Sequence, residues 1–385
     1  MIYNNLILNK NIFNQLQNHI KTSSIPNAFL FYGNKGSGKI AHAIEFAATL
    51  LCDNPIGTTA CSNCISCKKI KKNLNENIEF IMPLPKNKSI NKNDSPIKAL
   101  IDKDIENIKS NLNNKLLNPY HEIKVAGAKT ILINSIREIK KNINLSNINN
   151  KWKIYIIIES DKMCFPKQEA ANAMLKILEE PKEKHLFILI TSNISSIINT
   201  IKSRCLKLYF KQMNQHEIEN YLLNNTQIDS EKSKLISKIT NKDLSLAMKL
   251  SNSYEDIICN LEKCINIIYN NDFEKWIKFI NKLSRKKNDL IMILDLLEIF
   301  YSDIIIYKNT NNDNLVKFYI FKKIINIFLE TYNNVNWQSC IEKINNAKKN
   351  ITNNSNLEIC LISLIIELNK TFNNTKFLDY QSIYE

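Results

Sequence analysis

Short apolar runs alternate with helical patterns over the first 210 residues of the chain. The runs are AFLFYG (28–33), IEFIMPL (78–84), KIYIIIE (153–159), HLFILITS (185–192) and the shorter CLKLYF (205–210). Nearly continuous apolar runs separated by helices are typical of a parallel sheet that is covered on both faces. The pattern therefore predicts an α/β domain over residues 1–210.

Two helices between these runs are well marked. Residues 39–51 follow the first run and form its crossover helix. In KQEAANAMLKILEEP, one helical face collects apolar side chains and Pro181 ends the helix. The residues of that face are Ala170, Ala173, Met174, Ile177 and Leu178.

The remainder of the chain divides into a polar segment and a helical part. Residues 85–124 are rich in Lys and Asn, and we expect a surface insertion with at most one loose helix. From residue 211 onward the strand pattern ends. Helical patterns predict a small lid domain over residues 211–252 and a longer set of amphipathic helices over 253–385. The expected fold class is α/β followed by all-α.

Composition indicates the class of protein and its cellular compartment, and it says little about the function. The 385 residues are 44% hydrophobic and 23% charged, as in a folded globular protein, with a net charge of +15. Lys, Asn and Ile are over-used, which weakens the inference from charge, although nucleic acid remains a candidate partner. The start MIYNNLILNK lacks a secretory apolar core, and the most apolar stretch (290–307) contains three acidic residues. We expect a cytoplasmic protein without a membrane span.

The stretch GNKGSGKI resembles a phosphate-binding loop. Gly33, Gly36 and Gly38 allow backbone N–H groups to surround a phosphate, and Lys39 adds a positive charge. The stretch follows a predicted strand and opens a predicted helix, which is the required context. Ile40 stands where the pattern needs a hydroxyl for Mg²⁺, so we expect nucleotide binding to be weak or absent.

A second position for ATP hydrolysis is also altered. A P-loop ATPase ends the strand at 153–159 with two carboxylates, one for Mg²⁺ and one to orient water. This chain has Glu159 and Ser160 there, and Ser160 cannot polarise water as a carboxylate does. Asp161 follows, and on an extended backbone it would point to the opposite face.

Four of the ten cysteines crowd into 16 residues. Cys52, Cys61, Cys64 and Cys67 have the two-residue spacings of a knuckle, and four thiolates suit tetrahedral Zn²⁺. Because sulfur would fill all four positions, we expect this zinc to be structural.

Arg204 in KSRC is one of only three arginines in the chain. A guanidinium suits a phosphate better than an ammonium does, so Arg204 is a candidate phosphate-binding residue.

Together these motifs resemble one family. A P-loop with a four-cysteine insertion after its helix, then ANAMLKILEEP, then SRC, is similar to the bacterial DNA polymerase III clamp-loader subunits of the AAA+ superfamily. Three departures from the ATPase (gamma/tau) type favour the non-hydrolysing delta prime type. They are Ile40, the Glu159–Ser160 pair, and Ser245 in KDLSLAM, where the ATPase carries a sensor arginine.

The resemblance implies a subunit of a ring that loads a sliding clamp onto primer-template DNA. Its partners would be the gamma/tau and delta subunits, and residues 253–385 would form part of a helical collar. Arg204 would act in trans as an arginine finger on ATP bound by a neighbour. The chain would belong to the polymerase III holoenzyme and have neither polymerase nor ATPase activity of its own.

Two alternatives remain open from the sequence. Lys39 and the glycines leave room for an ATP-hydrolysing subunit of gamma/tau type. A zinc-containing DNA-binding protein on an inactive P-loop scaffold is the other alternative, and it predicts tight, salt-sensitive DNA binding by the isolated chain.

Overall fold

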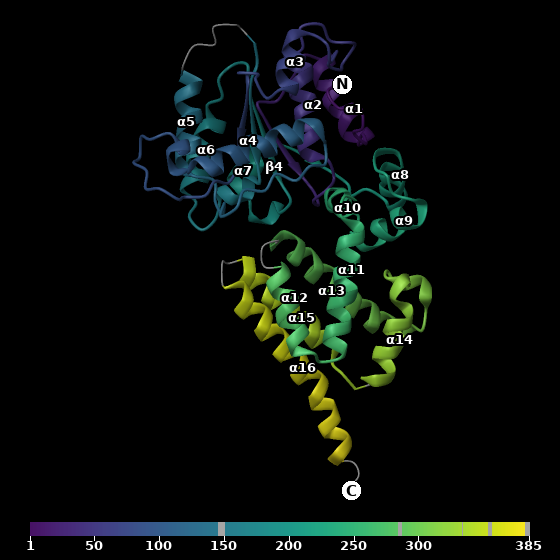
Figure 1. Ribbon diagram of the computed structural model, residues 1–385. Coiled ribbons are helices and arrows are strands. Elements are labelled where there is room, and N and C mark those ends of the chain that lie inside the picture. Colours follow the sequence, from purple (N-terminus) through teal and green to yellow (C-terminus); the bar gives the residue numbers. More distant parts are fainter. Residues whose placement is uncertain (145–150, 284–286, 333, 353–355, 382–385) are drawn as a thin grey trace. The chain divides into compact units, whose positions relative to one another are not determined.

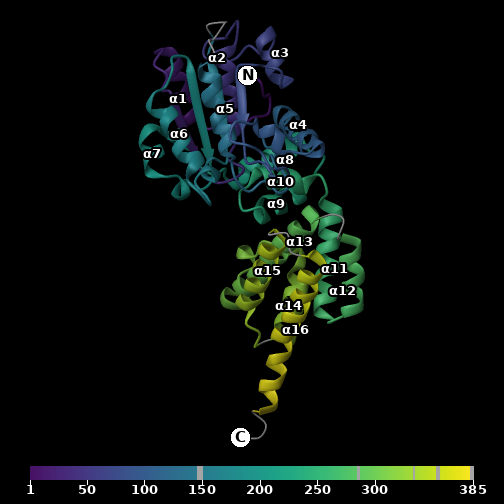
Figure 2. The same ribbon diagram turned by 90° about the vertical axis from the view of Figure 1, so that its left-hand side faces the viewer.

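The computed structural model describes residues 1–144, 151–283, 287–332, 334–352 and 356–381 (Figures 1 and 2). The chain forms two compact units. The first comprises residues 1–217 together with 242–248, and the second comprises 218–241 together with 249–385. The division into an α/β domain, a lid and a collar stays a prediction.

A five-stranded parallel sheet forms the centre of the first unit. Its strands are β1 (Ala28–Tyr32), β2 (Ile78–Ile81), β3 (Lys153–Ile158), β4 (His185–Thr191) and β5 (Leu206–Tyr209). The order is β2-β3-β4-β1-β5, so the first strand lies between β4 and β5. In the register, Phe29 lies beside Ile188 on one side and Leu206 on the other. All five predicted strands and their parallel arrangement are confirmed.

Helices cover both faces of this sheet, on opposite sides of it in Figure 1. One layer packs into the core with α1 (Lys10–Lys21), α2 (Lys39–Leu51), α3 (Ile65–Lys71) and α4 (Asp102–Leu117). The other layer contains α5 (Ile133–Asn144), α6 (Glu169–Glu179) and α7 (Asn199–Arg204). The predicted helix at 39–51 is confirmed. In α6, the expected residues Ala170, Met174, Ile177 and Leu178 are buried and Ala173 packs against the same cluster partly buried. Ala171, which was not expected, is also fully buried.

The polar segment 85–124 is more than a surface insertion. A short helix, η1 (Pro96–Ala99), precedes α4, and the C-terminal half of α4 packs Leu112 and Leu116 into the core. Tyr120 beyond it is almost completely buried. The expectation of a loose surface element is therefore wrong for this part, because a few spaced apolar residues suffice to anchor one helical face.

Only helices follow the sheet within the described residues, as predicted. They are α8 (Gln215–Asn225), α9 (Ser230–Ile239), α10 (Leu244–Ser251), α11 (Tyr254–Tyr269), α12 (Phe273–Leu283), α13 (Lys287–Thr310), α14 (Lys322–Thr331), α15 (Trp337–Thr352) and α16 (Leu357–Gln381). Buried Trp276 in α12 donates its Nε1–H to the Leu361 carbonyl at 2.9 Å, which joins α12 to α16. Among the described helices none is long and apolar enough to cross a membrane.

Candidate functional site

The glycine-rich loop joins β1 to α2 in the expected manner. Gly33 and Gly36 both have positive φ, and Gly38 is the left-handed N-cap of α2. Close packing also requires glycine at two of these places. A Cβ on Gly33 would lie 2.3 Å from the Phe210 carbonyl oxygen. The predicted strand–loop–helix context of the P-loop is thus present.

The ammonium of Lys39 is already bonded to its own loop. Nζ donates to the carbonyl oxygens of Gly33 at 2.7 Å and Asn34 at 2.5 Å, and it lies 3.3 Å from Ser37 Oγ. The residue is buried, and burial lowers the pKa of Lys39 to about 8 against the opposing field of Asp243. The charge that the motif reserves for a phosphate is therefore held by backbone carbonyls.

A carboxylate lies against the tip of the loop. A Cβ built on Gly36 would be 2.3 Å from Asp243 Oδ1 and 2.6 Å from the backbone nitrogen of Leu244. Asp243 is held there because Oδ1 accepts the N–H groups of Ser245 (2.9 Å) and Leu246 (3.2 Å) at the start of α10. Burial raises the pKa of this carboxyl group. A negative group thus borders the place where the motif would hold phosphate.

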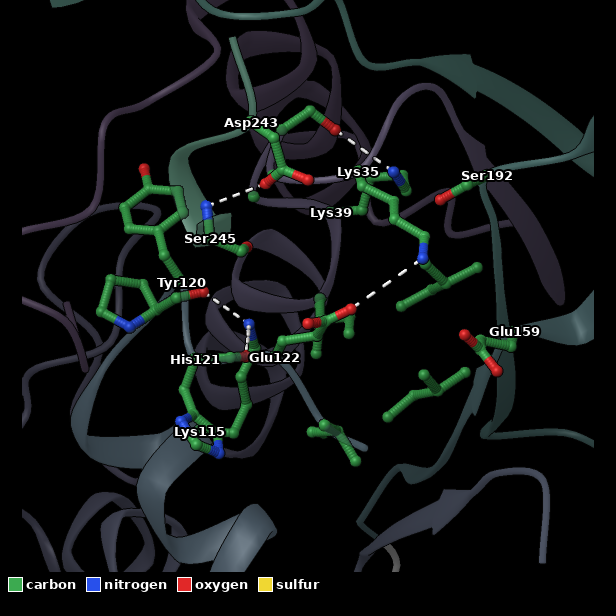
Figure 3. A pocket seen from close by; sticks show the side chains of 18 of the residues that line it. Lys35, Lys39, Lys115, Tyr120, His121, Glu122, Glu159, Ser192, Asp243 and Ser245 are labelled. Atoms are coloured by element: carbon green, nitrogen blue, oxygen red, sulfur yellow. Dashed lines mark hydrogen bonds and ion pairs between the residues drawn. The ribbon is translucent and has the colours of Figure 1, made fainter. Parts of the chain in front are cut away.

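The cavity beside the loop has a volume of about 100 Å³ and mixed charge (Figure 3). Glu122 and Glu159 line it together with Asp243, and Lys35 lies 3.9 Å from Glu122 across the opening. The three carboxylates would oppose a triphosphate. Three lysines also line the cavity: Lys35 pairs with Glu122, and Lys39 and Lys115 are bonded to backbone carbonyls.

Lys115 is a buried residue that lines the cavity. Its Nζ donates to the carbonyl oxygens of Pro119 (2.6 Å) and His121 (2.9 Å), and burial lowers the pKa of Lys115 to about 7. Sequence reasoning missed Lys115, Tyr120, His121, Glu122 and Asp243 as lining residues. In a chain so rich in lysine, composition offers no signal that Lys115 is one of the buried lysines.

The positions that depart from the ATPase pattern lie where the sequence placed them. Ile40, Glu159 and Ser245 all line the cavity. Ser160 is fully buried, and its hydroxyl donates to the Ile190 carbonyl at 3.2 Å, so it is turned away from any substrate.

Asp161 is removed from the cavity for a reason that differs from the prediction. The strand ends at Ile158, and residues 160–163 form a 3₁₀ turn, so the expected extended backbone is wrong. Instead, Thr191 Oγ1 donates to Asp161 Oδ1 at 2.6 Å and holds this carboxylate.

The buried His42 side chain in α2 hydrogen-bonds to the backbone at the end of the glycine-rich loop. Its Nε2 accepts the backbone N–H of Asn9 at 3.1 Å, and its Nδ1 lies 2.9 Å from the Gly38 carbonyl oxygen. A backbone N–H can only donate, so the ring is neutral with its proton on Nδ1. Burial lowers the pKa of His42 to about 4.

The four predicted cysteines come together. The ligand atoms of Cys52, Cys61, Cys64 and Cys67 all lie within 4.8 Å of one another. Cys52 Sγ is 3.8 Å from Cys64 Sγ and 3.6 Å from Cys67 Sγ. A tetrahedral Zn²⁺ with bonds of about 2.3 Å separates its sulfurs by about 3.8 Å, so the donor set and its spacing fit a metal ion.

Backbone N–H groups also support thiolates at this cluster. The N–H of Cys61 points to Cys52 Sγ at 3.3 Å, and that of Cys64 points to Cys61 Sγ at 3.3 Å. Such contacts from Asn63 and Cys64 lower the pKa of Cys61 to about 6, whereas burial raises the pKa of Cys52 and of Cys67. The ionised form of sulfur is the one that binds a metal.

Arg204 lies far from the glycine loop of its own chain. It ends α7 just before β5, whose Leu206 is level with Phe29 in the adjacent parallel β1. The loop begins at Gly33, beyond the C-terminal end of β1, whereas Arg204 precedes the N-terminal end of β5. At about 3.3 Å per residue this places the two sites roughly 15–20 Å apart along the strands. Within this chain, Arg204 cannot serve its own P-loop.

Comparison with known proteins identifies the family of the chain. Residues 8–214 match the family described as DNA polymerase III, delta subunit. The chain belongs to this family. The resemblance to clamp-loader subunits of DNA polymerase III that the motifs indicated is thereby confirmed. The expected fold class, α/β followed by all-α, agrees with the strands and helices of the described residues.

Individual relatives include both subunit types. The chain is 23% identical over 371 residues to the DNA polymerase III subunit delta' of Bacillus subtilis, covering 94% of this chain and 96% of that protein. It is 26% identical over 268 residues to the DNA polymerase III subunit gamma of Buchnera aphidicola subsp. Acyrthosiphon pisum. The match covers 69% of this chain and 59% of that protein. Among solved structures, a gamma subunit-related protein from Thermotoga maritima overlaps 93% of this chain and 99% of its own, with 15% identity and a TM-score of 0.44.

Proposed function

We propose that this chain is the non-hydrolysing, delta prime type subunit of a bacterial DNA polymerase III clamp loader. It assembles with gamma/tau-type ATPase subunits and a delta subunit, and the complex loads a sliding clamp onto primer-template DNA. The observation that carries the proposal is the state of the glycine loop. Lys39 is bonded to the loop's own carbonyls, and Asp243 lies against Gly36.

Three positions of this site lack the group that the ATPase pattern places there for hydrolysis. Ile40 has no hydroxyl for Mg²⁺, Ser160 is buried and bonded to Ile190, and Ser245 replaces a sensor arginine. Catalysis of phosphoryl transfer depends almost entirely on such positioning and charge stabilisation. The chain therefore keeps the fold and contributes no turnover of its own.

Arg204 supplies catalytic charge to a neighbouring subunit. Its distance from the home loop excludes action in cis, and its guanidinium is partly exposed at the end of α7. An arginine finger given in trans is worth about 10³–10⁵ in kcat at the site it serves. The partner pocket would hold ATP, whose transferring phosphate carries the charge that Arg204 stabilises.

The cysteine cluster binds a structural Zn²⁺. All four ligand positions are sulfur, so no coordination site remains for water or substrate. The ion's contribution is to hold the segment between α2 and α3 in place, and the chemistry of the complex does not pass through it.

Reconstitution of the complete complex tests the proposal. Arg204→Ala should assemble normally and lower the DNA-stimulated ATPase, while Lys202→Ala, in the same helix, should not. Unchanged ATPase with Arg204→Ala would refute the finger. ATP turnover by the purified chain itself would favour the gamma/tau alternative, and tight salt-sensitive DNA binding by the isolated chain would favour the DNA-binding alternative.

A further inference from the structure

A second cavity lies at the edge of the sheet, away from the glycine loop. β2 is the outermost strand, and the cavity is enclosed between it, η1, α4 and α5. Its volume is about 300 Å³. Half of its 14 lining residues come from residues 96–112, to which the proposed clamp-loader function assigns no role.

The wall is largely apolar. Ten of the 14 lining residues are hydrophobic, among them Phe80, Ile97 and Leu112, and the other four are Glu79, Lys109, Ser135 and Glu138. A cavity of about 150 Å³ with such a lining is enough to bind benzene. A volume of 300 Å³ accommodates a body of two fused rings or a short alkyl chain.

The polar part of the wall carries a negative charge. Glu79 accepts one long hydrogen bond, from Asn142 Nδ2 at 3.4 Å, and Glu138 accepts the Ser95 hydroxyl at 3.0 Å. Within the described part of the chain neither carboxylate has a lysine or arginine within ion-pair distance. Burial raises the pKa of Glu79, the charge of Lys153 lowers it, and the charge of Glu138 raises it. Among the lining residues, the exposed Lys109 offsets one of the two acids.

We propose that this cavity is a binding site for a small apolar amine. The rings or chain of the ligand fill the space between β2 and α4, and its ammonium group lies against Glu79 and Glu138. Charge selects the head group, because an amine gains an ion pair that an alcohol or an acid cannot make. Pockets of this size, mostly apolar with a few converging polar groups, are the usual form of a small-molecule site.

Three probes of one shape test the proposal on the intact chain. They are 1-naphthylmethylamine, 1-naphthalenemethanol and 1-naphthoic acid, titrated by calorimetry. A charge-assisted hydrogen bond is worth about 1.5–3 kcal/mol, so the amine should bind about tenfold or more tighter than the alcohol, with the acid weakest. Equal affinities, or no binding of any probe, would overturn the proposal.

Two variants locate the binding. Glu79→Gln together with Glu138→Gln keeps the volume and removes both carboxylates, so the amine should fall to the affinity of the alcohol. Ile97→Trp changes a residue that is both part of the wall and 58% exposed, so it should weaken all three probes without disturbing the core. Glu122→Gln in the other cavity is the matched control. A preference for the amine that survives the replacement of both glutamates would contradict the assignment. The three-probe comparison on the unaltered chain stands even if a variant misfolds.

Discussion

The Arg204 guanidinium and the Glu179 carboxylate form an ion pair of 2.8 Å between the ends of α7 and α6. Nη1 of the arginine also donates to the Thr200 carbonyl at 3.1 Å. Both side chains are more than one third exposed, so the pair contributes about 0–1 kcal/mol to stability. The pair orients the guanidinium, since two bonds from different helices define its direction.

Glu179→Ala should therefore change function more than stability. In urea unfolding we expect the free energy to fall by at most about 1 kcal/mol. In the reconstituted complex the ATPase should fall, because the arginine then spends less time in its aimed conformation. Glu180→Ala, one residue further along the chain, is the control. A large loss of stability with Glu179→Ala, at normal ATPase, would show that the pair is only structural.

Restoring the Mg²⁺ hydroxyl alone should not restore nucleotide binding. Ile40→Thr leaves Asp243 against Gly36, and a like charge a few ångströms away costs a phosphate on the order of several kcal/mol. Ile40→Thr with Asp243→Asn keeps the cap of α10, since Asn caps as well as Asp. The double variant should bind a fluorescent ATP analogue about tenfold or more tighter than Ile40→Thr.

The matched control for this comparison is Ile40→Thr with Asp229→Asn. Asp229 caps α9 in the same way, accepting the Lys232 N–H at 2.8 Å, and does not line the cavity. If both double variants bind the analogue alike, the carboxylate at Gly36 is not what opposes the phosphate.

Metal should be bound in a ratio of one Zn²⁺ per chain. Elemental analysis of the purified protein measures it, and Cys64→Ser should reduce it sharply. A ligand present at 100 to 1,000 times its Kd stabilises the fold by about 3–4 kcal/mol, and chelation should remove that amount and lower Tm. Cys259→Ser, at an exposed cysteine outside the cluster, should alter neither quantity. Full zinc content in Cys64→Ser would contradict the four-sulfur site.

Acid should weaken the fold through His42. Its pKa is about 4 in the folded chain and about 6.5 in the unfolded chain, so the unfolded state binds more protons between these values. Stability therefore falls as pH decreases from 6.5 to 4, by about 3 kcal/mol for this group. Protonation of Nε2 also breaks the bond from Asn9.

His42→Gln should flatten this part of the profile of unfolding free energy against pH. His216→Gln, at an exposed position, is the control and should leave the slope unchanged. A slope that His42→Gln does not alter would show that another group is responsible.

The strands and the cysteine cluster were predictable because their signals are local. A fully buried strand such as His185–Thr191 is apolar at almost every position, and Cys61, Cys64 and Cys67 are neighbours in sequence. The P-loop was found for the same reason. Each of these features depends on residues a few positions apart, which a periodicity or a spacing can record.

The contents of the cavity were not predictable because they depend on contacts between distant segments. Asp243 meets Gly36 across more than 200 positions, and Lys115 is buried through Pro119 and His121 after α4 has packed on the sheet. A lone aspartate before LSLAM indicates a helix cap and no more. Only the folded chain shows that the same carboxylate borders the phosphate loop.

The bonds of Lys39 change how a familiar experiment must be interpreted. In an ATPase, replacing the loop lysine removes a ligand of the nucleotide and leaves the empty fold intact. Here the same side chain closes the loop by bonding Gly33 and Asn34, so Lys39→Ala would loosen the loop even when no nucleotide is present. A loss of clamp loading in that variant would therefore report damaged architecture, and it could not be counted as evidence that this subunit uses ATP.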